Sequence, residues 1–349
     1  MFAATFFDGE GWRDGVLDTG DGRPALRDAW ATPGMPRLDG VLIGGFTDHH
    51  VHLQLVDPAL LAASALGRVV DLGAEPGVIA ALAAAGGVED ASARGGGVEN
   101  ASDSRVLDAF STPHRVETSH RVAVEYAGAF LTAVGGYPSG REWAPAGSFR
   151  EIPDATDAHV AVREMADAGA SCVKVASNST AGPTFDDDVF RAIVQAARAL
   201  ELPVVAHAEG RGEAQRVARL GADRLAHAPF TERLTDAEIA EQTASVSWIS
   251  TLAIHGGADL HVALDNVRRF HAAGGSVLYG TDMGNGPTPV GLNPQEIAAL
   301  QDAGITGRAL LRALAPQDAL DPASVLLRLP GTDAGPTLAR PLTSADLKA

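Results

Sequence analysis

The sequence predicts an α/β fold built around a closed (β/α)8 TIM barrel, and two observations support this. From residue 154 onward, short apolar strand-like runs alternate with helix-like segments, a pattern typical of parallel strands joined by helical crossovers. Candidate strands upstream bring the total to eight, which fits a closed barrel better than an open sheet. The eight candidate strands span residues 41–46, 68–72, 129–134, 171–176, 203–207, 224–227, 246–251 and 276–280.

Helical patterns separate the later strands. Residues 156–167 follow a capping position and stop at Gly169. Residues 186–200 carry acidic side chains in the first turn and apolar side chains at helical spacing. Similar patterns over residues 213–220 and 260–273 predict two further helices.

Two regions fall outside this alternation. Residues 1–40 contain short strand-like pieces divided by Asp-Gly turn signals, which predicts a small β appendage. Residues 84–120 are rich in Gly, Ser and Ala and show no clear period. A loop of that length in a compact domain is usually a lid or disordered, so we expect a mobile loop there.

The composition excludes several classes of protein. The chain has 44 Asp and Glu and 27 Lys and Arg, which gives a net charge of −17. This charge argues against nucleic acid or an anionic membrane as the main partner. Cys172 is the only cysteine, which rules out an intrachain disulfide and a Cys-rich zinc site. The first ten residues lack a secretory signal pattern, and no apolar run reaches the ~20 residues of a membrane span. We therefore expect a cytoplasmic protein whose partner is a small-molecule substrate.

A His-x-His pair follows the first predicted strand. Side chains alternate along a strand, so His50 and His52 share a face with Asp48 while His49 faces away. Two imidazoles on one face can chelate a single metal ion. Taken alone, the pair is explained equally well by a chance cluster of histidines in a loop.

Four further polar residues lie at or near the carboxyl ends of later predicted strands. Lys174 lies within the apolar run SCVKVA, where a buried ammonium must be paired, deprotonated or chemically altered. His207, His227 and Asp282 end or follow three other strands. Barrel enzymes place their catalytic groups at these strand ends. A single such residue would be unremarkable core packing, but five strands converging in this way indicate a catalytic centre.

The chain resembles the amidohydrolase superfamily of metal-dependent hydrolases. The matching segments occur in the family's order over about residues 38–325. They are GGFTDHHVH (44–52), VVDLG (69–73), AGASCVKVAS (168–177), LPVVAHAEG (202–210), GADRLAHAP (221–229) and GGSVLYGTDMG (274–284). The pattern is nearest to imidazolonepropionase-like enzymes and Xaa-Pro dipeptidase-like amidases, because the deaminases generally lack a metal-bridging lysine.

This resemblance implies a binuclear metal centre. One ion would be held by the His-x-His pair with Asp282 and the other by the remaining two histidines, bridged by Lys174 as its N-carboxylate. The six implied ligands are His50, His52, Lys174, His207, His227 and Asp282. Hydroxide bound between the metals would be the nucleophile, and Asp282 would act as general base and acid. Two zinc ions per chain are expected, with manganese or iron as alternatives.

Three residues are candidates for substrate contact. Tyr137 and Arg141 lie in GGYPSGREW, a stretch that resembles a family segment lining the substrate pocket. Tyr137 could donate a hydrogen bond to the oxyanion, and Arg141 could hold a substrate carboxylate. His255 follows the seventh predicted strand and could also touch substrate. An ordinary surface turn and a loop histidine are the competing interpretations.

The domain division and the reaction follow from the same reasoning. We expect a barrel over residues 41–325 and a small appendage over 1–40 and 326–349, a reduced β-sandwich because residues 329–349 are short and turn-rich. We expect hydrolysis of an amide or related C–N bond in an N-acyl amino acid, a dipeptide-like or a cyclic amide substrate. A mononuclear deaminase and a non-catalytic scaffold are the alternatives. Homo-oligomers are common in the family.

Overall fold

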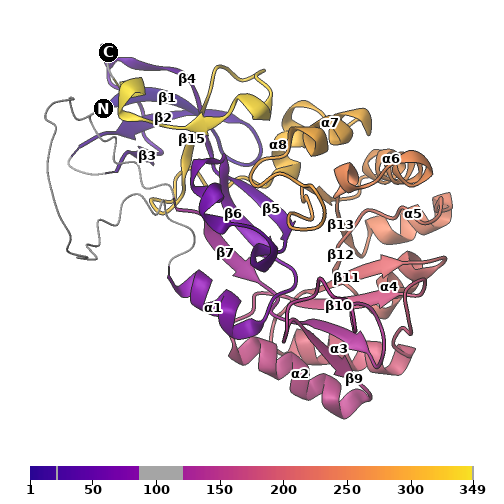
Figure 1. Ribbon diagram of the computed structural model, residues 1–349. Helices are drawn as coiled ribbons and strands as arrows, with labels where there is room; N and C mark the ends of the chain where they lie inside the picture. Colours follow the sequence, from indigo (N-terminus) through magenta and orange to yellow (C-terminus); the bar gives the residue numbers. More distant parts are fainter. Residues whose placement is uncertain (21–22, 86–120, 348–349) are drawn as a thin grey trace, which may run out of the picture.

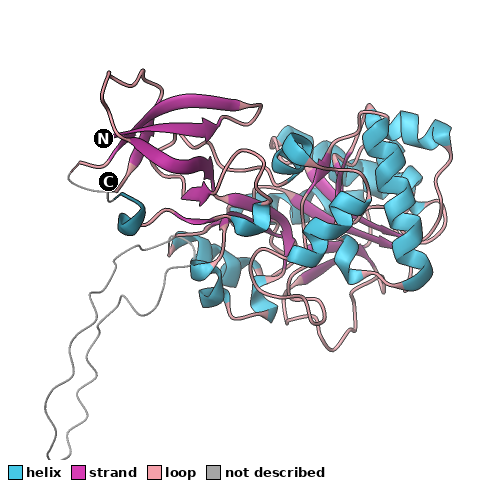
Figure 2. Ribbon diagram, turned by 90° about the horizontal axis from the view of Figure 1, so that it is seen from above, coloured by secondary structure: helices cyan, strands magenta, loops and turns pink. Residues whose placement is uncertain are grey.

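The computed structural model describes residues 1–20, 23–85 and 121–347. Apart from residues 84 and 85, the loop predicted over 84–120 lies outside these ranges. Within them the fold is mixed α/β, with two sheets of parallel strands and one sheet formed by the chain ends. Figure 2 shows the terminal sheet and the helix-flanked parallel strands at opposite ends of the molecule.

The parallel strands form a seven-stranded and a three-stranded sheet. The first has the order β14-β13-β12-β11-β10-β8-β9 and the second β5-β6-β7. The strand bounds are β5 (Phe46–Val51), β6 (Leu66–Asp71), β7 (Ala123–Tyr126), β8 (Phe130–Ala133), β9 (Phe149–Ile152), β10 (Val173–Asn178), β11 (Val204–Glu209), β12 (Arg224–Leu225), β13 (Ser247–Ile249) and β14 (Val277–Leu278).

Hydrogen bonds connect the two parallel sheets at both edges of the three-stranded sheet. A parallel bridge joins Val51 at the end of β5 to Met283, and the His49 amide donates to the Tyr279 carbonyl at 3.0 Å. At the other edge, the Ser171 amide donates to the Tyr126 carbonyl at 2.8 Å. The carboxyl end of the first parallel strand therefore lies beside the segment that follows the last one.

Helices lie along the outer side of strands β10–β13 (Figure 1). The helix bounds are α1 (Pro76–Ala84), α2 (Ala155–Asp167), α3 (Asp187–Ala199), α4 (Glu213–Leu220), α5 (Asp236–Thr243), α6 (Gly257–Ala272), α7 (Pro294–Asp302) and α8 (Gly307–Ala313). The four predicted helices appear as α2, α3, α4 and α6. Asp154 caps α2, because its carboxylate accepts from the Thr156 amide at 2.7 Å. In the part of the chain that the structure describes, no helix has the length and apolar character of a membrane span.

The chain ends form a single six-stranded sheet with the order β16-β15-β4-β1-β2-β3. Its strands are β1 (Phe2–Phe7), β2 (Trp12–Asp18), β3 (Ala25–Arg27), β4 (Arg37–Gly44), β15 (Leu326–Leu329) and β16 (Arg340–Pro341). The carboxyl-terminal strand β15 pairs antiparallel with β4, so the two ends of the chain complete one another.

The predicted strand over residues 41–46 is wrong. Residues 41–44 belong to β4 in the terminal sheet, and the first parallel strand is β5. The apolar run reads as one strand because the side chains on both sides of the break are buried. Gly44 and Gly45 make the break possible, because a Cβ at Gly44 would lie 2.0 Å from the Gln317 carbonyl oxygen and one at Gly45 2.6 Å from the Gly67 Cα.

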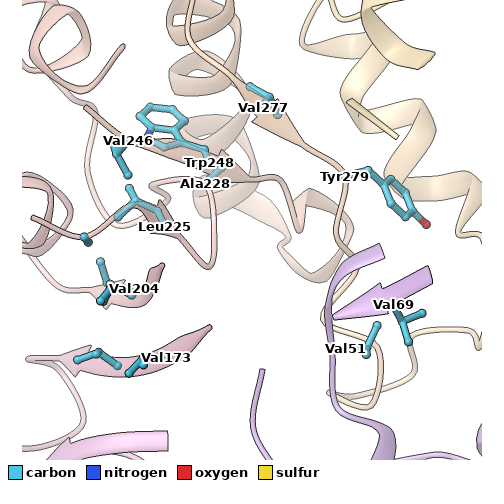
Figure 3. Packing of buried hydrophobic residues seen from close by; sticks show 14 of the residues in the cluster. Val51, Val69, Val173, Val204, Leu225, Ala228, Val246, Trp248, Val277 and Tyr279 are labelled. Atoms are coloured by element: carbon cyan, nitrogen blue, oxygen red, sulfur yellow. The ribbon is translucent and has the colours of Figure 1, made fainter. Parts of the chain in front are cut away.

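The core lies between the parallel strands and the helices. Figure 3 shows buried side chains from successive strands packed together, among them Val173, Val204 and Leu225. Trp248 on β13 stacks on Phe270 of α6 with ring centroids 3.8 Å apart. Its indole nitrogen donates to the Gln242 side chain at 2.9 Å, which satisfies the one polar atom of a fully buried tryptophan.

Candidate metal centre

One cavity of about 320 Å³ gathers most of the predicted site residues. They come from β5, β10 and β11 and from the segments after β5, β8, β12, β13 and β14; Lys174 lies near the amino end of β10, not near its carboxyl end as predicted. Eight predicted residues line it: His50, His52, Tyr137, Lys174, His207, His227, His255 and Asp282. Arg141 does not, since its side chain is exposed and donates to the Ala181 carbonyl at 3.4 Å.

Three ligand atoms converge at the base of this cavity. Nε2 of His50 lies 3.3 Å from Oδ1 of Asp282, and Nε2 of His52 lies 3.2 Å from the same oxygen. One ligand atom from each residue lies within 4.8 Å of the other two, and all three side chains are buried. Alternation along β5 and the bridge from Val51 to Met283 bring these residues together from opposite ends of the sequence.

Hydrogen bonds fix the ring orientation of both histidines. Nδ1 of His50 lies 2.8 Å from the Ala226 carbonyl, and Nδ1 of His52 lies 3.3 Å from the Gly73 carbonyl. A carbonyl can only accept, so each Nδ1 carries the proton and donates it. Burial lowers the pKa of His50 well below its usual value, so this imidazole is neutral. Its Nε2 lone pair then faces a carboxylate oxygen, an arrangement that a cation would stabilise.

The other two histidines lie beside the first group. The His227 ring is 4.7 Å from His50 and 4.8 Å from His207, centroid to centroid. Nδ1 of His227 lies 2.9 Å from the Thr251 hydroxyl, which leaves Nε2 free for the cavity. Burial lowers the pKa of His227 well below its usual value. Nε2 of His207 lies 3.1 Å from Oε2 of Glu209, so this histidine has a carboxylate partner.

Lys174 is buried in the middle of the site, with 1% of its surface exposed. Its Nζ lies 3.4 Å from Nε2 of His50 and 5.7 Å from the centre of the Phe130 ring. Burial lowers the pKa of Lys174 to about 8, with Asp282 opposing the shift. About a tenth of this amine is therefore uncharged at pH 7, far more than for an ordinary lysine.

Asp282 is ionised and held in an unusual backbone conformation. Burial alone would raise the pKa of Asp282, but the imidazoles of His50 and His52 outweigh it and keep the pKa well below its usual value. The residue has a φ of 53°, in the left-handed region that costs energy for any side chain. The Asn285 side-chain amide donates to Oδ2 at 2.8 Å, which leaves Oδ1 facing the histidines.

Two buried aspartates support the site, and sequence reasoning did not assign them a role. Asp48 accepts hydrogen bonds from the Thr281 hydroxyl at 2.6 Å and the His50 amide at 3.0 Å, so it ties β5 to the segment that carries Asp282. Asp71 accepts from the Leu53 amide at 2.6 Å and fixes the chain just after His52. The detectable signal was a carboxylate beside the histidine pair in β5 and another at the end of the run VVD in β6.

Aromatic side chains form the walls of the cavity. Tyr137 stacks on His207 with centroids 5.3 Å apart, and burial raises its pKa, so its hydroxyl keeps the proton and can donate. His255 packs on Phe230 at 4.2 Å, and its Nε2 has no hydrogen-bond partner within the described structure. Phe130 and Trp143 also line the cavity, and the sequence patterns did not single them out.

Solved structures resemble this fold over nearly its whole length. A Xaa-Pro dipeptidase with bound methionine in its active site matches at a TM-score of 0.64 and 14% identity, covering 96% of this chain and 94% of that one. An amidohydrolase matches at 0.65 and 14%, with coverage of 99% and 97%. An ochratoxinase from A. niger matches at 0.63 and 14%, with coverage of 98% and 94%.

Comparisons with protein-family models and with curated proteins find no match. At these sequence identities the structural likeness bears on the fold, and it agrees with the resemblance of the sequence motifs. The chain has the same fold as these solved structures.

Proposed function

We propose that the protein is a metal-dependent hydrolase that cleaves an amide or related C–N bond. The observation that carries this proposal is the convergence of three buried ligand atoms, from His50, His52 and Asp282, within 4.8 Å of one another. The expected substrates are N-acyl amino acids, dipeptide-like molecules or cyclic amides. The cavity of about 320 Å³ lies within the usual size range of small-molecule sites.

The donor set fits a divalent ion. Ligand atoms about 2.1 Å from a tetrahedral zinc ion lie about 3.4 Å from one another. The two nitrogen–oxygen separations here, 3.3 and 3.2 Å, are close to that value. Imidazole and carboxylate donors suit zinc, with manganese or iron as alternatives. We propose that His207 and His227 hold a second ion and that Lys174, as its N-carboxylate, bridges the two.

The chain's own groups are arranged for hydrolysis. A bound divalent ion would lower the pKa of water and polarise the scissile carbonyl. Asp282 accepts the proton of the attacking water and returns it to the leaving nitrogen, so that an acid and an amine are released. Tyr137 donates its hydroxyl proton in a hydrogen bond to the developing oxyanion. The second carboxylate oxygen of Asp282 is held by Asn285, which keeps the reacting oxygen directed at the cavity.

The architecture proposed with this function is a (β/α)8 barrel over residues 41–325. Hydrogen bonds that join both edges of the three-stranded sheet to the seven-stranded sheet support ring closure. Residues 1–40 and 326–349 would form the appendage, with β4 crossing the boundary between the two parts.

One observation favours the mononuclear deaminase as a second candidate. His207 is engaged by Glu209 and does not belong to the tight group around Asp282, so the structure has one compact ligand cluster among its described residues. In a deaminase Lys174 would be unmodified and a single ion would bind tightly.

An activity panel separates these candidates. Protein stripped with a chelator is supplied with zinc, manganese or iron, then assayed for amine release from N-acyl amino acids, dipeptides and cyclic amides. Ammonia release from purine-like and guanidine-like compounds is assayed in parallel. We expect amide cleavage that is lost in Asp282→Asn and kept in the exposed control His159→Gln. Metal-loaded, folded protein that releases only ammonia would overturn the hydrolase proposal in favour of the deaminase.

A further inference from the structure

The metal cavity opens onto a second cavity. This neighbour has a volume of about 330 Å³ and extends between Pro287 and the start of α7 at Asn293 and Gln295. Six residues line both cavities: Glu209, Phe230, Ile254, His255, Asn285 and Gly286. The two volumes therefore adjoin along a shared wall, and Glu209 is part of that wall.

The described lining of both cavities has little positive charge. Lys174 is the only Lys or Arg among these lining residues, and it is buried against His50. Two carboxylates, Asp282 and Glu209, lie in the same lining. Glu209 has 27% of its side chain exposed, and among the described residues no Lys or Arg pairs with it. A substrate carboxylate at this junction would therefore lie beside a like charge, with no Lys or Arg in the described lining near Glu209 to offset the repulsion.

Hydrogen bonds hold the Glu209 carboxylate in place and leave it able to accept a further one. Its Oε2 accepts from the Asn178 side-chain amide at 2.7 Å and lies 3.1 Å from Nε2 of His207, while its Oε1 accepts from the Thr180 hydroxyl at 3.0 Å. An ionised carboxylate offers about four acceptor positions, so at least one remains for a ligand. These partners fix the position of the carboxylate.

Another part of the cavity wall is aromatic. Phe130 and Tyr137 both approach Trp143, with ring centroids 6.5 and 5.9 Å from it. The Trp143 side chain is exposed at the mouth, with 42% of its surface accessible. An uncharged aromatic or aliphatic group would remove this surface from water without desolvating a charge.

We propose that Glu209 selects substrates by charge, an inference that rests on the proposed hydrolase function. The part of the substrate next to Glu209 is neutral or cationic, and the part against Phe130, Tyr137 and Trp143 is uncharged. Amides that carry a free carboxylate beside Glu209 are poor substrates. The proposal narrows the expected substrates to amides without a free carboxylate beside Glu209. It places no carboxylate-binding group in the described cavity lining.

The competing hypothesis is that Arg141 binds a substrate carboxylate. It lies outside the cavity lining, yet its charge acts on the neighbouring Tyr137 and lowers the pKa of that phenol against the larger effect of burial. If Arg141 anchored a substrate carboxylate, anionic amides would be preferred and Arg141→Gln would abolish that preference.

The kinetic test uses three amides with a common phenylacetyl group. Their amine portions are ethylenediamine, glycinamide and glycine, which are cationic, neutral and anionic at the far end. A mirror series places the same charges on the acyl portion. The series whose charged end lies beside Glu209 should show charge selection. In that series we expect the zinc-loaded protein to have a kcat/KM about tenfold or more higher for the cationic amide than for the anionic amide. Glu209→Gln should reduce that ratio about tenfold, mainly through KM, and Arg141→Gln should leave it unchanged.

A binding measurement separates failure of this inference from failure of the proposed function. Phenethyltrimethylammonium, which has no lone pair for a metal, and neutral 2-phenylethanol are titrated calorimetrically into wild type and Glu209→Gln. We expect the cation to lose about tenfold in affinity in the variant and the alcohol to be unaffected. If the cation loses affinity in Glu209→Gln but no amide is cleaved, the inference about Glu209 is kept and the proposed hydrolase function is rejected. Equal loss for both probes, or loss of bound metal in Glu209→Gln, would overturn the inference.

Discussion

Glu296 on α7 provides a quantitative test of the buried electrostatics behind the site. The side chain is fully buried, its Oε2 accepts from the Ala253 amide at 2.6 Å, and its Oε1 has no partner within the described structure. Burial raises the pKa of Glu296 to about 7 from its usual 4.5, against hydrogen bonds from Ser250, Leu252 and Ala253 that lower it. The folded chain therefore keeps this proton in a range where the unfolded chain releases it.

The sign and size of the effect follow from that difference. Below pH 4.5 both states are protonated and Glu296 carries no penalty. As the pH rises from 4.5 towards 7, the unfolded state binds fewer protons than the folded state, so the free energy of unfolding falls. The two pKa values differ by about 2.5, and one unit corresponds to about 1.4 kcal/mol, so the loss approaches about 3 kcal/mol above pH 7. Glu296→Gln removes the titrating group and should remove this loss.

Urea unfolding of metal-free protein at about pH 5 and about pH 8 measures it. The stability difference between wild type and Glu296→Gln should shift by about 2.5 kcal/mol in favour of the variant between the two pH values, because part of the loss is already present at pH 5. Asp48, whose pKa burial also raises to about 7, is present in both proteins. Glu142→Gln, at an exposed position, is the control and should follow wild type. Parallel pH profiles for wild type and Glu296→Gln would refute the reasoning.

Three further changes test the site and the core. Lys174→Met should abolish amide hydrolysis. The melting curve by far-UV circular dichroism should be retained, because an apolar side chain of similar length fills the buried position. Activity at the full rate would reject the bridging role of Lys174. Thr251→Val leaves Nδ1 of His227 without its partner and should lower metal affinity by about 10–100-fold in a chelator competition, whereas unchanged affinity would show that the Thr251 hydroxyl has no orienting role. Trp248→Ala removes the stack on Phe270 and should cost about 3–5 kcal/mol in urea unfolding, and a cost below about 1 kcal/mol would contradict the packing described here.

Most of the candidate metal centre could be predicted because its residues lie in, or shortly after, parallel strands. His207 lies within β11, and Lys174 lies within β10, so each is placed by its own strand. In parallel strands the carboxyl ends share one edge, so residues far apart in sequence meet without any pairwise signal between them. The same rule carried His227 and Asp282 to the cavity.

The remaining features depend on tertiary contacts that the sequence pattern does not encode. The break between β4 and β5 is set by the approach of the Gln317 backbone from more than 250 residues away, which no local period reveals. Strand β7 was not predicted, because its AVEY sequence is short and only its last residue is buried. Arg141 was a reasonable candidate by residue type, yet the direction of its side chain is decided by its contact with Ala181.

The central claim, that His50, His52 and Asp282 hold a divalent ion beside a second pair of histidines, is tested most directly by counting metal. Elemental mass spectrometry on protein reconstituted with zinc and freed of excess ion should find about two ions per chain. His52→Ala should lose the ion at the His50, His52 and Asp282 group, and the exposed control His159→Gln should bind as wild type does. One tightly bound ion would favour the deaminase, and no binding by folded wild-type protein would contradict the account.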